Sequence, residues 1–324
     1  MTINPAQPVR LQPVYIPKPW GQEIWYTGME SRGESRVELE SGDTLPLSRY
    51  LAEDPEGTCD HQPVLLLKIL DPDPEPVLGD LYFEVHEEKR EVYVVTHIDP
   101  KAWPDGIGAI RFGMHQSVRA AYGSDAAFRT AYRDAVARYE QIRRQIDEAG
   151  QPVSARVEAE ARTEMERFTA TRSLRVGDVV RVPTWTPHAL QHGVRVVEFQ
   201  TPTYERFILS FAQRVLTQNH WDTAHAVARM ILDRPLAEEF EEVAPGVQRI
   251  ARFEDFNVWR VHQHPELSLP RDLPYAVCMG LTGESRIGSL ILYPEQAGFL
   301  PRQSISRTTI DASAAQLLIA APGL

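Results

Sequence analysis

The chain has 324 residues and a mass of 36.7 kDa, enough for two domains or one large domain with an extensive hydrophobic core. Its 34 Lys and Arg against 45 Asp and Glu give a net charge of −11, and the two signs are interspersed along the chain. A uniformly acidic surface repels phosphate backbones, which argues against nucleic acid as the main partner, although one basic pocket could still bind a small anion.

Membrane and disulfide signals are missing from the sequence. The longest apolar runs, such as residues 64–67, are far too short to cross a bilayer, and the N-terminus carries Pro, Gln and Arg where a signal peptide needs an apolar stretch. Cys59 and Cys278 lie far apart and predict neither a disulfide framework nor a thiolate metal site. We therefore expect a soluble, cytoplasmic protein.

The first third of the chain has the pattern of short strands and turns. Gly and Pro recur at short intervals up to residue 60, and the apolar run 63–70 predicts a strand that ends in a turn-rich segment. Residues 81–86 and 91–98 predict two further strands, and the charged residues between them predict a hairpin. Later strands are expected in the sequences DVVRVPTW (178–185), VRVVEFQT (194–201) and ERFILSF (205–211).

The middle of the chain has helical periodicity instead. Apolar residues recur at helical spacing between 125 and 148, and a second, polar helix is expected up to about Phe168. A further helix is predicted over 223–232, extended by 237–242, and short strands and turns are predicted from 247 to the end.

Four polar side chains have the spacing of a metal site. On a strand, Glu84 and His86 point to the same face because side chains alternate, and a bend at 87–90 can return Glu91 to that face. Downstream, glycine and proline frame a strand and turn that deliver His188 to the start of the next strand. Two imidazoles and two carboxylates form a ligand set that suits zinc, iron or manganese.

This spacing resembles the two motifs of the cupin superfamily. The first motif is matched by Glu84-x-His86 with Glu91 following, and the second by Gly177, Pro183 and His188, with Trp185 where Gly is usual. The resemblance implies a β-barrel that binds one divalent metal through Glu84, His86, Glu91 and His188. Because Glu84 stands where the family has His or Gln, a barrel that has lost its metal is the alternative.

Within the cupins, the chain resembles the type I mannose-6-phosphate isomerase family over most of residues 15–210. The resemblance rests on the KPWG motif at 18–21, the strand at 63–71, the metal motifs separated by a helical insertion, and the segments Glu198–Gln200 and Tyr204–Arg206. Residues 280–301 resemble a second, degenerate cupin.

The resemblance implies a mainly β fold with a helical insertion. The expected domains are a cupin (double-stranded β-helix, or jelly-roll) barrel over 1–102 with 172–212, a helical insertion over 103–171, a helical connection over 213–245, and a C-terminal cupin-like domain over 246–324.

The same family implies an aldose–ketose isomerisation of mannose 6-phosphate and fructose 6-phosphate through a cis-enediol. One divalent metal, Zn²⁺ first with Fe²⁺ or Mn²⁺ as alternatives, would act as Lewis acid. Arg206 and Lys89 would hold the phosphate, Glu198 would transfer the proton, and Trp20 would line the pocket. The expected partner is a small hexose phosphate, with no nucleic acid or membrane, and the chain would act as a monomer or homodimer.

Three departures from the family concern the site directly. Glu84 adds a negative charge, the loop between His86 and Glu91 is shorter than in most members, and the stretch from Glu198 to Arg206 is compressed. For the individual residues, the alternatives are a solvated Lys89, an Arg206 paired with Glu205, a solvent-facing Glu198 and a Trp20 in the core.

Two other functions are compatible with the same residues. One is a different metallo-cupin enzyme, such as an oxidoreductase that acts on a small organic acid with iron or manganese. The other is a non-catalytic cupin that binds a sugar phosphate.

Overall fold

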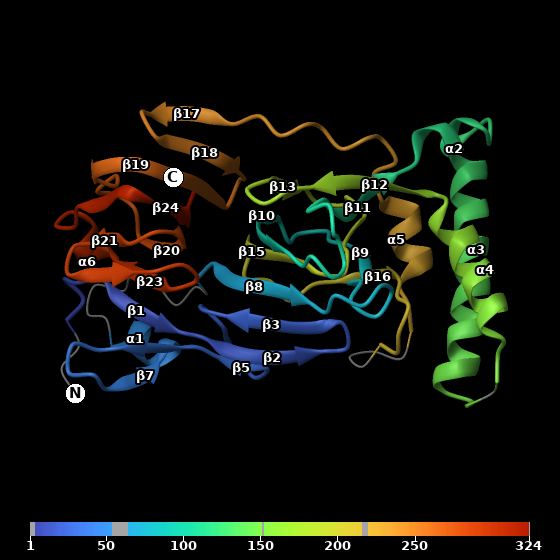
Figure 1. Cartoon of the computed structure of the whole chain (residues 1–324), viewed down its shortest axis with the longest axis horizontal. Coiled ribbons are helices and arrows are strands. Elements are labelled where there is room, and N and C mark those ends of the chain that lie inside the picture. The colour runs from blue at the N-terminus through green and yellow to red at the C-terminus, as the bar shows by residue number, and fades with distance from the viewer. Residues whose placement is uncertain (1–3, 54–63, 151, 216–219, 324) are drawn as a thin grey trace.

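The computed structural model describes residues 4–53, 64–150, 152–215 and 220–323. Figure 1 shows an elongated molecule with the C-terminal strands at one end, a column of helices at the other and a β-barrel between them. Cys59 lies outside the described ranges, and Cys278 is a buried free thiol. No helix in the described part of the chain is long and apolar enough to cross a membrane.

Two antiparallel sheets form the central barrel. The first has the strand order β13-β10-β15-β8-β3-β2 and the second the order β12-β11-β14-β9-β16. The strands of the first sheet are β2 (Val14–Lys18), β3 (Gly21–Trp25), β8 (Leu66–Pro72), β10 (Glu91–Ile98), β13 (Val179–Val182) and β15 (Val194–Gln200). Those of the second are β9 (Phe83–Val85), β11 (Gly108–Met114), β12 (Thr169–Leu174), β14 (His188–Leu190) and β16 (Phe207–Ser210).

The six-stranded sheet is buried on both faces, which explains its nearly continuous apolar runs. On β10, Tyr93 and Val95 face a core shared with the five-stranded sheet, whereas Val92 and Val94 face a second core shared with the C-terminal strands. Polar residues at one end of the inner face, beginning with Glu91, therefore lie inside the barrel. The predicted strands at 63–70, 178–185, 194–201 and 205–211 are confirmed by β8, β13, β15 and β16.

The hairpin predicted from residues 81–98 is wrong. β9 pairs with β14 and β16 in one sheet, while β10 pairs with β13 and β15 in the other. The short charged segment between them crosses from one sheet to the other. The apolar strand β10 pairs at both edges and has both faces covered, one by the five-stranded sheet and one by the C-terminal strands. The connection between His86 and Glu91 thus spans the end of the barrel.

Helices cover the outer face of the five-stranded sheet. These helices are α3 (Asp125–Asp147), α4 (Ala155–Glu166) and α5 (Thr223–Arg229), with the short α2 (Gln116–Ala120) before α3. The other two described helices, α1 (Leu47–Ala52) and α6 (Arg302–Ile305), lie against N-terminal and C-terminal strands at the other end of the molecule. The predicted apolar stripe of α3 is confirmed, since Phe128, Tyr132 and Val136 are fully buried in one cluster with Phe83 of β9. Helices α3 and α4 lie side by side beyond α5 in Figure 1.

The helix predicted over 237–242 is not formed. Residues 231–240 are irregular, and β17 (Glu241–Ala244) pairs as an edge strand with β18 (Val247–Arg252). Leu236 and Phe240 are exposed, so this segment has no buried face that would stabilise a helix. The predicted helix over 223–232 is confirmed in the shorter form of α5.

The C-terminal strands form an eleven-stranded sheet together with the N-terminus. Its main path is β17-β18-β19-β24-β20-β23-β1-β6-β7, and β21 and β22 pair at its side. The strands not yet given are β1 (Val9–Gln12), β6 (Arg36–Glu38), β7 (Thr44–Pro46), β19 (Phe256–Leu267), β20 (Tyr275–Thr282), β21 (Ser285–Ile287), β22 (Leu290–Leu292), β23 (Ala297–Pro301) and β24 (Ile310–Pro322), with β4 (Met29–Glu30) and β5 (Gly33–Glu34) as a separate pair.

Strand pairing departs from the expected segment boundaries in two places. The N-terminal strands β1, β6 and β7 belong to the C-terminal sheet, and β11, within the range expected to be helical, belongs to the barrel. Pairing partners far apart in sequence decide both cases. The division of the chain into domains itself stays a prediction.

Candidate functional site

A polar cleft opens at the end of the barrel where the connection between β9 and β10 crosses. It has a cavity volume of about 120 Å³. Its inner lining comes from β3, β8, β9 and the segment 200–206, and its charged residues are Lys18, Glu23, Glu30, Arg32, Lys68, Glu84, Lys89, Glu205 and Arg206. Such a cleft could bind a small polar or charged molecule.

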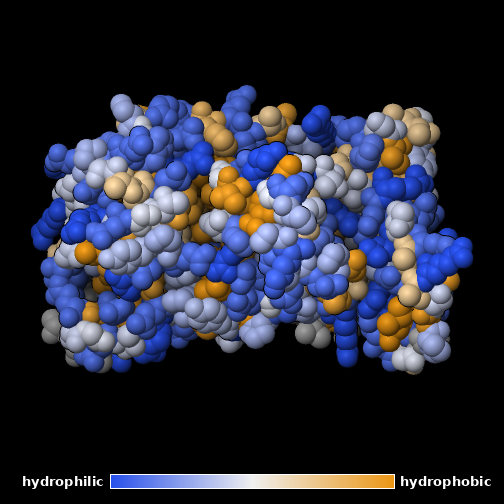
Figure 2. Space-filling view, viewed as in Figure 1, coloured by the Kyte–Doolittle hydropathy of each residue, from blue (hydrophilic) through white to orange (hydrophobic). Residues whose placement is uncertain are grey.

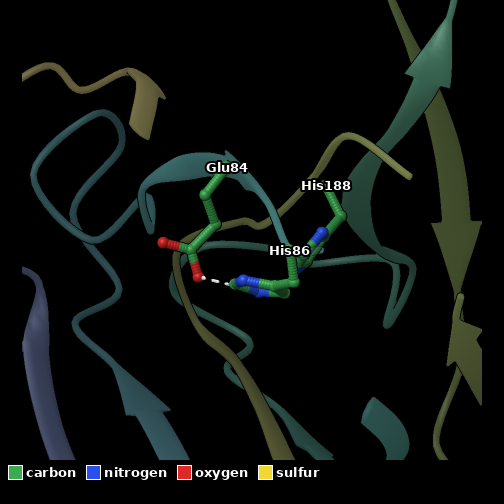
Figure 3. A group of neighbouring side chains, drawn as sticks. All are labelled: Glu84, His86 and His188. Carbon is green, nitrogen blue, oxygen red and sulfur yellow. Dashed lines mark ion pairs between the residues drawn. The ribbon is translucent and has the colours of Figure 1, made fainter. Parts of the chain in front are cut away.

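The four predicted metal ligands converge at the inner end of this cleft. Glu84, His86 and His188 each offer one ligand atom, and these atoms lie within 4.8 Å of one another (Figure 3). Glu91 closes the group, since its carboxylate oxygens lie 3.4 Å from Nε2 of His86 and 3.1 Å from Nε2 of His188. Residues from three strands and one connection thus meet around one point.

Backbone contacts in the 183–188 turn orient both histidines. His188 begins β14, as predicted, and its Nδ1 lies 2.9 Å from the carbonyl oxygen of Thr186, which leaves Nε2 to face the group. The backbone N–H of Trp185 donates to the carbonyl of His86 at 2.6 Å. Trp185 has a φ of 59°, the left-handed conformation that explains why glycine is usual at this position.

Burial and neighbouring charges shift the pKa values of three members of this group. Burial holds the pKa of His86 well below its ordinary value, so the imidazole is neutral. Burial alone would raise the pKa of Glu91, but the Lys89 ammonium and the two imidazoles hold it well below its usual range. Burial raises the pKa of Glu84, against the opposing charge of Arg206.

Unsatisfied buried atoms indicate that this group is built for a cation. Both ring nitrogens of His86 and Oε2 of Glu84 are buried and make no hydrogen bond within the described part of the chain. Buried polar groups normally have partners, and a neutral imidazole with carboxylates is a donor set that a divalent ion satisfies. The residues present therefore fit a metal ion.

Lys89 and Arg206 both lie in the cleft, as predicted. Lys89 is buried, and its Nζ lies 2.5 Å from Oε1 of Glu91, so the solvated alternative is wrong. The guanidinium of Arg206 lies 3.5 Å from Oε2 of Glu84 and packs over the ring of Tyr82 at 4.2 Å. Arg206 thus contacts the carboxylate of Glu84.

Glu198 is buried in the barrel rather than exposed to solvent. Its carboxylate lies 3.2 Å from Nζ of Lys68, which lines the cleft. Burial raises the pKa of Glu198 well above its ordinary value, since the charged form is poorly solvated there. This carboxyl lies directly behind the cleft.

Trp20 does not line the cleft, contrary to the prediction. It is 1% exposed and packs in the apolar core of the barrel with Leu70 and Tyr93. A large indole ring fills volume between two sheets more readily than it faces a charged opening. The KPWG motif therefore contributes to the core at this position.

Several cleft residues were missed by sequence reasoning. Lys68 is the one charge within the otherwise apolar, buried run at 64–70, and that contrast was a usable signal. The guanidinium of Arg32 lies 5.0 Å from the ring centre of Trp25 and 4.0 Å from that of Tyr204. It carried no such signal, since Tyr204 is distant in sequence. Glu23 accepts a hydrogen bond from Trp25 Nε1 at 2.7 Å.

Comparisons with known proteins identify the fold. No family model matches the chain, and no curated protein matches it in sequence. Among solved structures, mannose 6-phosphate isomerase from Bacillus subtilis is similar over 97% of this chain and 99% of its own, with a TM-score of 0.69 and 18% identity.

Two further solved structures agree. A phosphomannose isomerase from Salmonella typhimurium (a variant) has a TM-score of 0.72, and a zinc-bound mannose 6-phosphate isomerase has 0.71. Each is 13% identical and is similar over 98% of this chain and 100% of its own. The expected mainly β fold is thereby confirmed.

Proposed function

We propose that this chain is a metal-dependent aldose–ketose isomerase that interconverts mannose 6-phosphate and fructose 6-phosphate through a cis-enediol. The observation that carries the proposal is the convergence of Glu84, His86, Glu91 and His188 at the inner end of a charged cleft. The names of the structurally similar proteins, one of them zinc-bound, support the choice of reaction and metal.

The four converging side chains would hold one divalent ion, zinc first and iron or manganese as alternatives. A divalent ion at this place would supply Lewis acidity for the oxyanion that develops during the isomerisation. Tyr93 supports the set from behind, because its hydroxyl donates to Oε2 of Glu91 at 2.5 Å. Such hydrogen bonds fix the orientation of a ligand carboxylate.

The proton that moves between C1 and C2 of the sugar needs a group that can hold it. Glu198 is our candidate, because burial raises its pKa well above the ordinary value, so this carboxyl holds a proton more readily than an exposed one. Lys68 lies 3.2 Å from the Glu198 carboxylate and lines the cleft. Its ammonium group would therefore connect this carboxyl with the bound sugar. Trp20 has no part in this proposal, since it is in the core.

Arg206 and Lys89 are our candidates for the substrate phosphate. Both are now paired with carboxylates of the proposed metal set, Arg206 with Glu84 and Lys89 with Glu91. Their charge is therefore available to a substrate anion only where those carboxylates have another cation. We therefore expect phosphate binding to depend on the metal. The positive charge of the metal would also offset the repulsion between an anionic substrate and this acidic protein.

We further propose the cellular setting and the division of labour in the chain. The net charge of −11 and the mostly hydrophilic face shown in Figure 2 support a cytoplasmic protein that acts on a small molecule, without nucleic acid, as a monomer or homodimer. Residues 1–102 with 172–212 would hold the metal, with 103–171 as helical insertion, 213–245 as connection and 246–324 as C-terminal domain.

Elemental analysis of the purified protein, combined with a coupled assay on mannose 6-phosphate, tests the function. We expect about one equivalent of a divalent metal and fructose 6-phosphate formation that a chelator abolishes and added zinc restores. Bound iron with oxygen uptake would instead indicate an oxidoreductase. Binding of the hexose phosphate without turnover would indicate a non-catalytic cupin.

A further inference from the structure

The connection between His86 and Glu91 is held by a carboxylate from another part of the chain. Glu205 accepts hydrogen bonds from three consecutive backbone N–H groups: that of Glu87 at 2.6 Å, that of Glu88 at 2.7 Å and that of Lys89 at 3.1 Å. Consecutive N–H groups directed at one point form an anion-binding concavity. Here the bound anion belongs to the protein itself.

The far end of the same connection is held by the same segment. The backbone N–H of Arg90 donates to Oγ1 of Thr201 at 3.1 Å, and the backbone N–H of Thr201 donates to the carbonyl of Arg90 at 3.0 Å. Residues 201–205 thus bind all four residues of the connection. Among these contacts, those of Glu205 carry a full charge, and charge-assisted hydrogen bonds are roughly twice as strong as neutral ones.

The side chains of Glu87 and Glu88 do not attract the Glu205 carboxylate. Glu87 and Glu88, whose N–H groups it binds, are themselves acidic and exposed, so their side chains repel its carboxylate. The backbone N–H groups must therefore account for the contact. Because these hydrogen bonds hold the carboxylate close to two like charges, they also hold the backbone of residues 87–89 in one conformation.

The conformation of this connection is important because site residues lie at its two ends and within it. His86 and Glu91 stand at its two ends and face each other across 3.4 Å, and Lys89 within it reaches Glu91. Arg206, which follows Glu205 directly, contacts Glu84. The Glu205 carboxylate thus anchors the connection that carries His86, Lys89 and Glu91. It also adjoins Arg206, which contacts Glu84.

We propose that Glu205 is a positioning residue for the metal centre: its carboxylate holds the 87–89 backbone so that His86, Lys89 and Glu91 keep their places. The part of this inference that concerns metal rests on the proposed function. The part that concerns the backbone does not, and it can be measured separately.

The test compares Glu205→Gln with the unaltered protein and with Glu254→Gln. The amide introduced by Glu205→Gln keeps the size of the side chain but presents a donor to backbone donors. Glu254 is a matched control, because its 85%-exposed carboxylate contacts the same connection only through the side chain of Arg90. Three readouts apply: zinc affinity by competition with a chelator, the absorption spectrum of the Co²⁺-loaded protein, and amide hydrogen exchange at residues 87–89.

We expect Glu205→Gln to weaken zinc binding about 10- to 100-fold, the usual effect of losing a residue that orients a ligand. Its Co²⁺ spectrum should change, and exchange at residues 87–89 should accelerate about tenfold or more. Glu254→Gln should leave all three readouts unaltered. If Glu205→Gln does not fold, Glu205→Asp, which keeps the charge on a shorter side chain, should give intermediate values.

Unaltered exchange rates in Glu205→Gln would overturn the proposal, as would faster exchange with unaltered zinc affinity and Co²⁺ spectrum. Tight metal binding in the unaltered protein without isomerase activity would count against the proposed function alone. If the unaltered protein binds no metal, the metal centre is wrong and the exchange rates alone decide whether Glu205 orders the connection.

Discussion

The Glu84 carboxylate lies between an imidazole and a guanidinium. One oxygen is 3.5 Å from Nε2 of His86 and the other is 3.5 Å from Nε of Arg206. With Glu91, it would cancel the charge of a divalent ion, whereas an amide at position 84 would leave one positive charge. Residual positive charge strengthens a Lewis acid and attracts an anionic substrate.

We therefore predict that Glu84→Gln keeps the metal and raises isomerase turnover severalfold, as measured by metal content and the coupled assay. Glu30→Gln is the matched control, because Glu30 also lines the cleft but pairs with Arg32 at its mouth. Unchanged or lower turnover in Glu84→Gln would contradict the electrostatic argument.

Glu23 is a buried carboxylate whose charge is strongly stabilised. Burial alone would raise its pKa, but the ammonium groups of Lys68 and Lys18 and the hydrogen bond from Trp25 lower it to about 2. Because the folded-state pKa lies below the unfolded value of 4.5, the stabilisation is complete above pH 4.5 and is lost as the pH falls towards 2.

Glu23→Gln should therefore lower the free energy of unfolding by about 3 kcal/mol at pH 7 and by about half of that at pH 3. Denaturant unfolding of both proteins at a series of pH values measures the difference. A difference that does not shrink between pH 7 and 3 would show that the charge of Glu23 is not its source.

At the scale of elements, the two helices of the insertion begin differently. Ser124 precedes α3 and its hydroxyl accepts a hydrogen bond from the backbone N–H of Ala127 at 3.2 Å. Ser154 precedes α4, and its side chain makes no capping hydrogen bond within the described residues. Both are serines at the N-cap position, so they form a matched pair.

Ser124→Ala should lower the free energy of unfolding by about 1 kcal/mol, the usual value for a lost cap, and Ser154→Ala by clearly less. Thermal or denaturant unfolding measures both. Metal content should stay the same in each variant, because both positions lie on the helices outside the barrel. Equal losses in the two variants would contradict the role of the Ser124 hydroxyl.

At the scale of the whole molecule, one apolar core joins the barrel to the C-terminal sheet. Leu67 and Phe199 of the six-stranded sheet share it with Val277 and Phe299 of the eleven-stranded sheet. Arg195 adds ion pairs with Asp71 at 2.6 Å and with Glu295 at 2.8 Å. The two halves therefore stabilise each other across a common interior.

The isolated segment 246–324 should consequently not fold by itself. It would lack β1, which pairs with β23, and the whole barrel side of the shared core. Circular dichroism and proton NMR of this segment should show an unfolded chain, while the full chain should unfold in a single transition. A cooperatively folded segment would contradict this interdependence.

Local patterns were sufficient for helix α3, for the start of β14 and for the grouping of two proposed metal ligands. The period of Phe128, Tyr132 and Val136 determines α3, because a helix brings residues three and four apart to one face. The Gly and Pro residues before His188 determine that it starts a strand. Alternation on a strand correctly grouped Glu84 with His86, whose side chains need only short-range geometry to meet.

Long-range pairing decided everything else. Three features depend on partners that are distant in sequence. They are the placement of β9 and β10 in different sheets, the position of Trp20 in the core, and the hydrogen bonds of Glu205 to the 87–89 backbone. A strand can satisfy its hydrogen bonds with any neighbour of suitable register, so its sequence specifies a face and a length but not a partner. Only the assembled barrel determines which side chains meet in the cleft at its end.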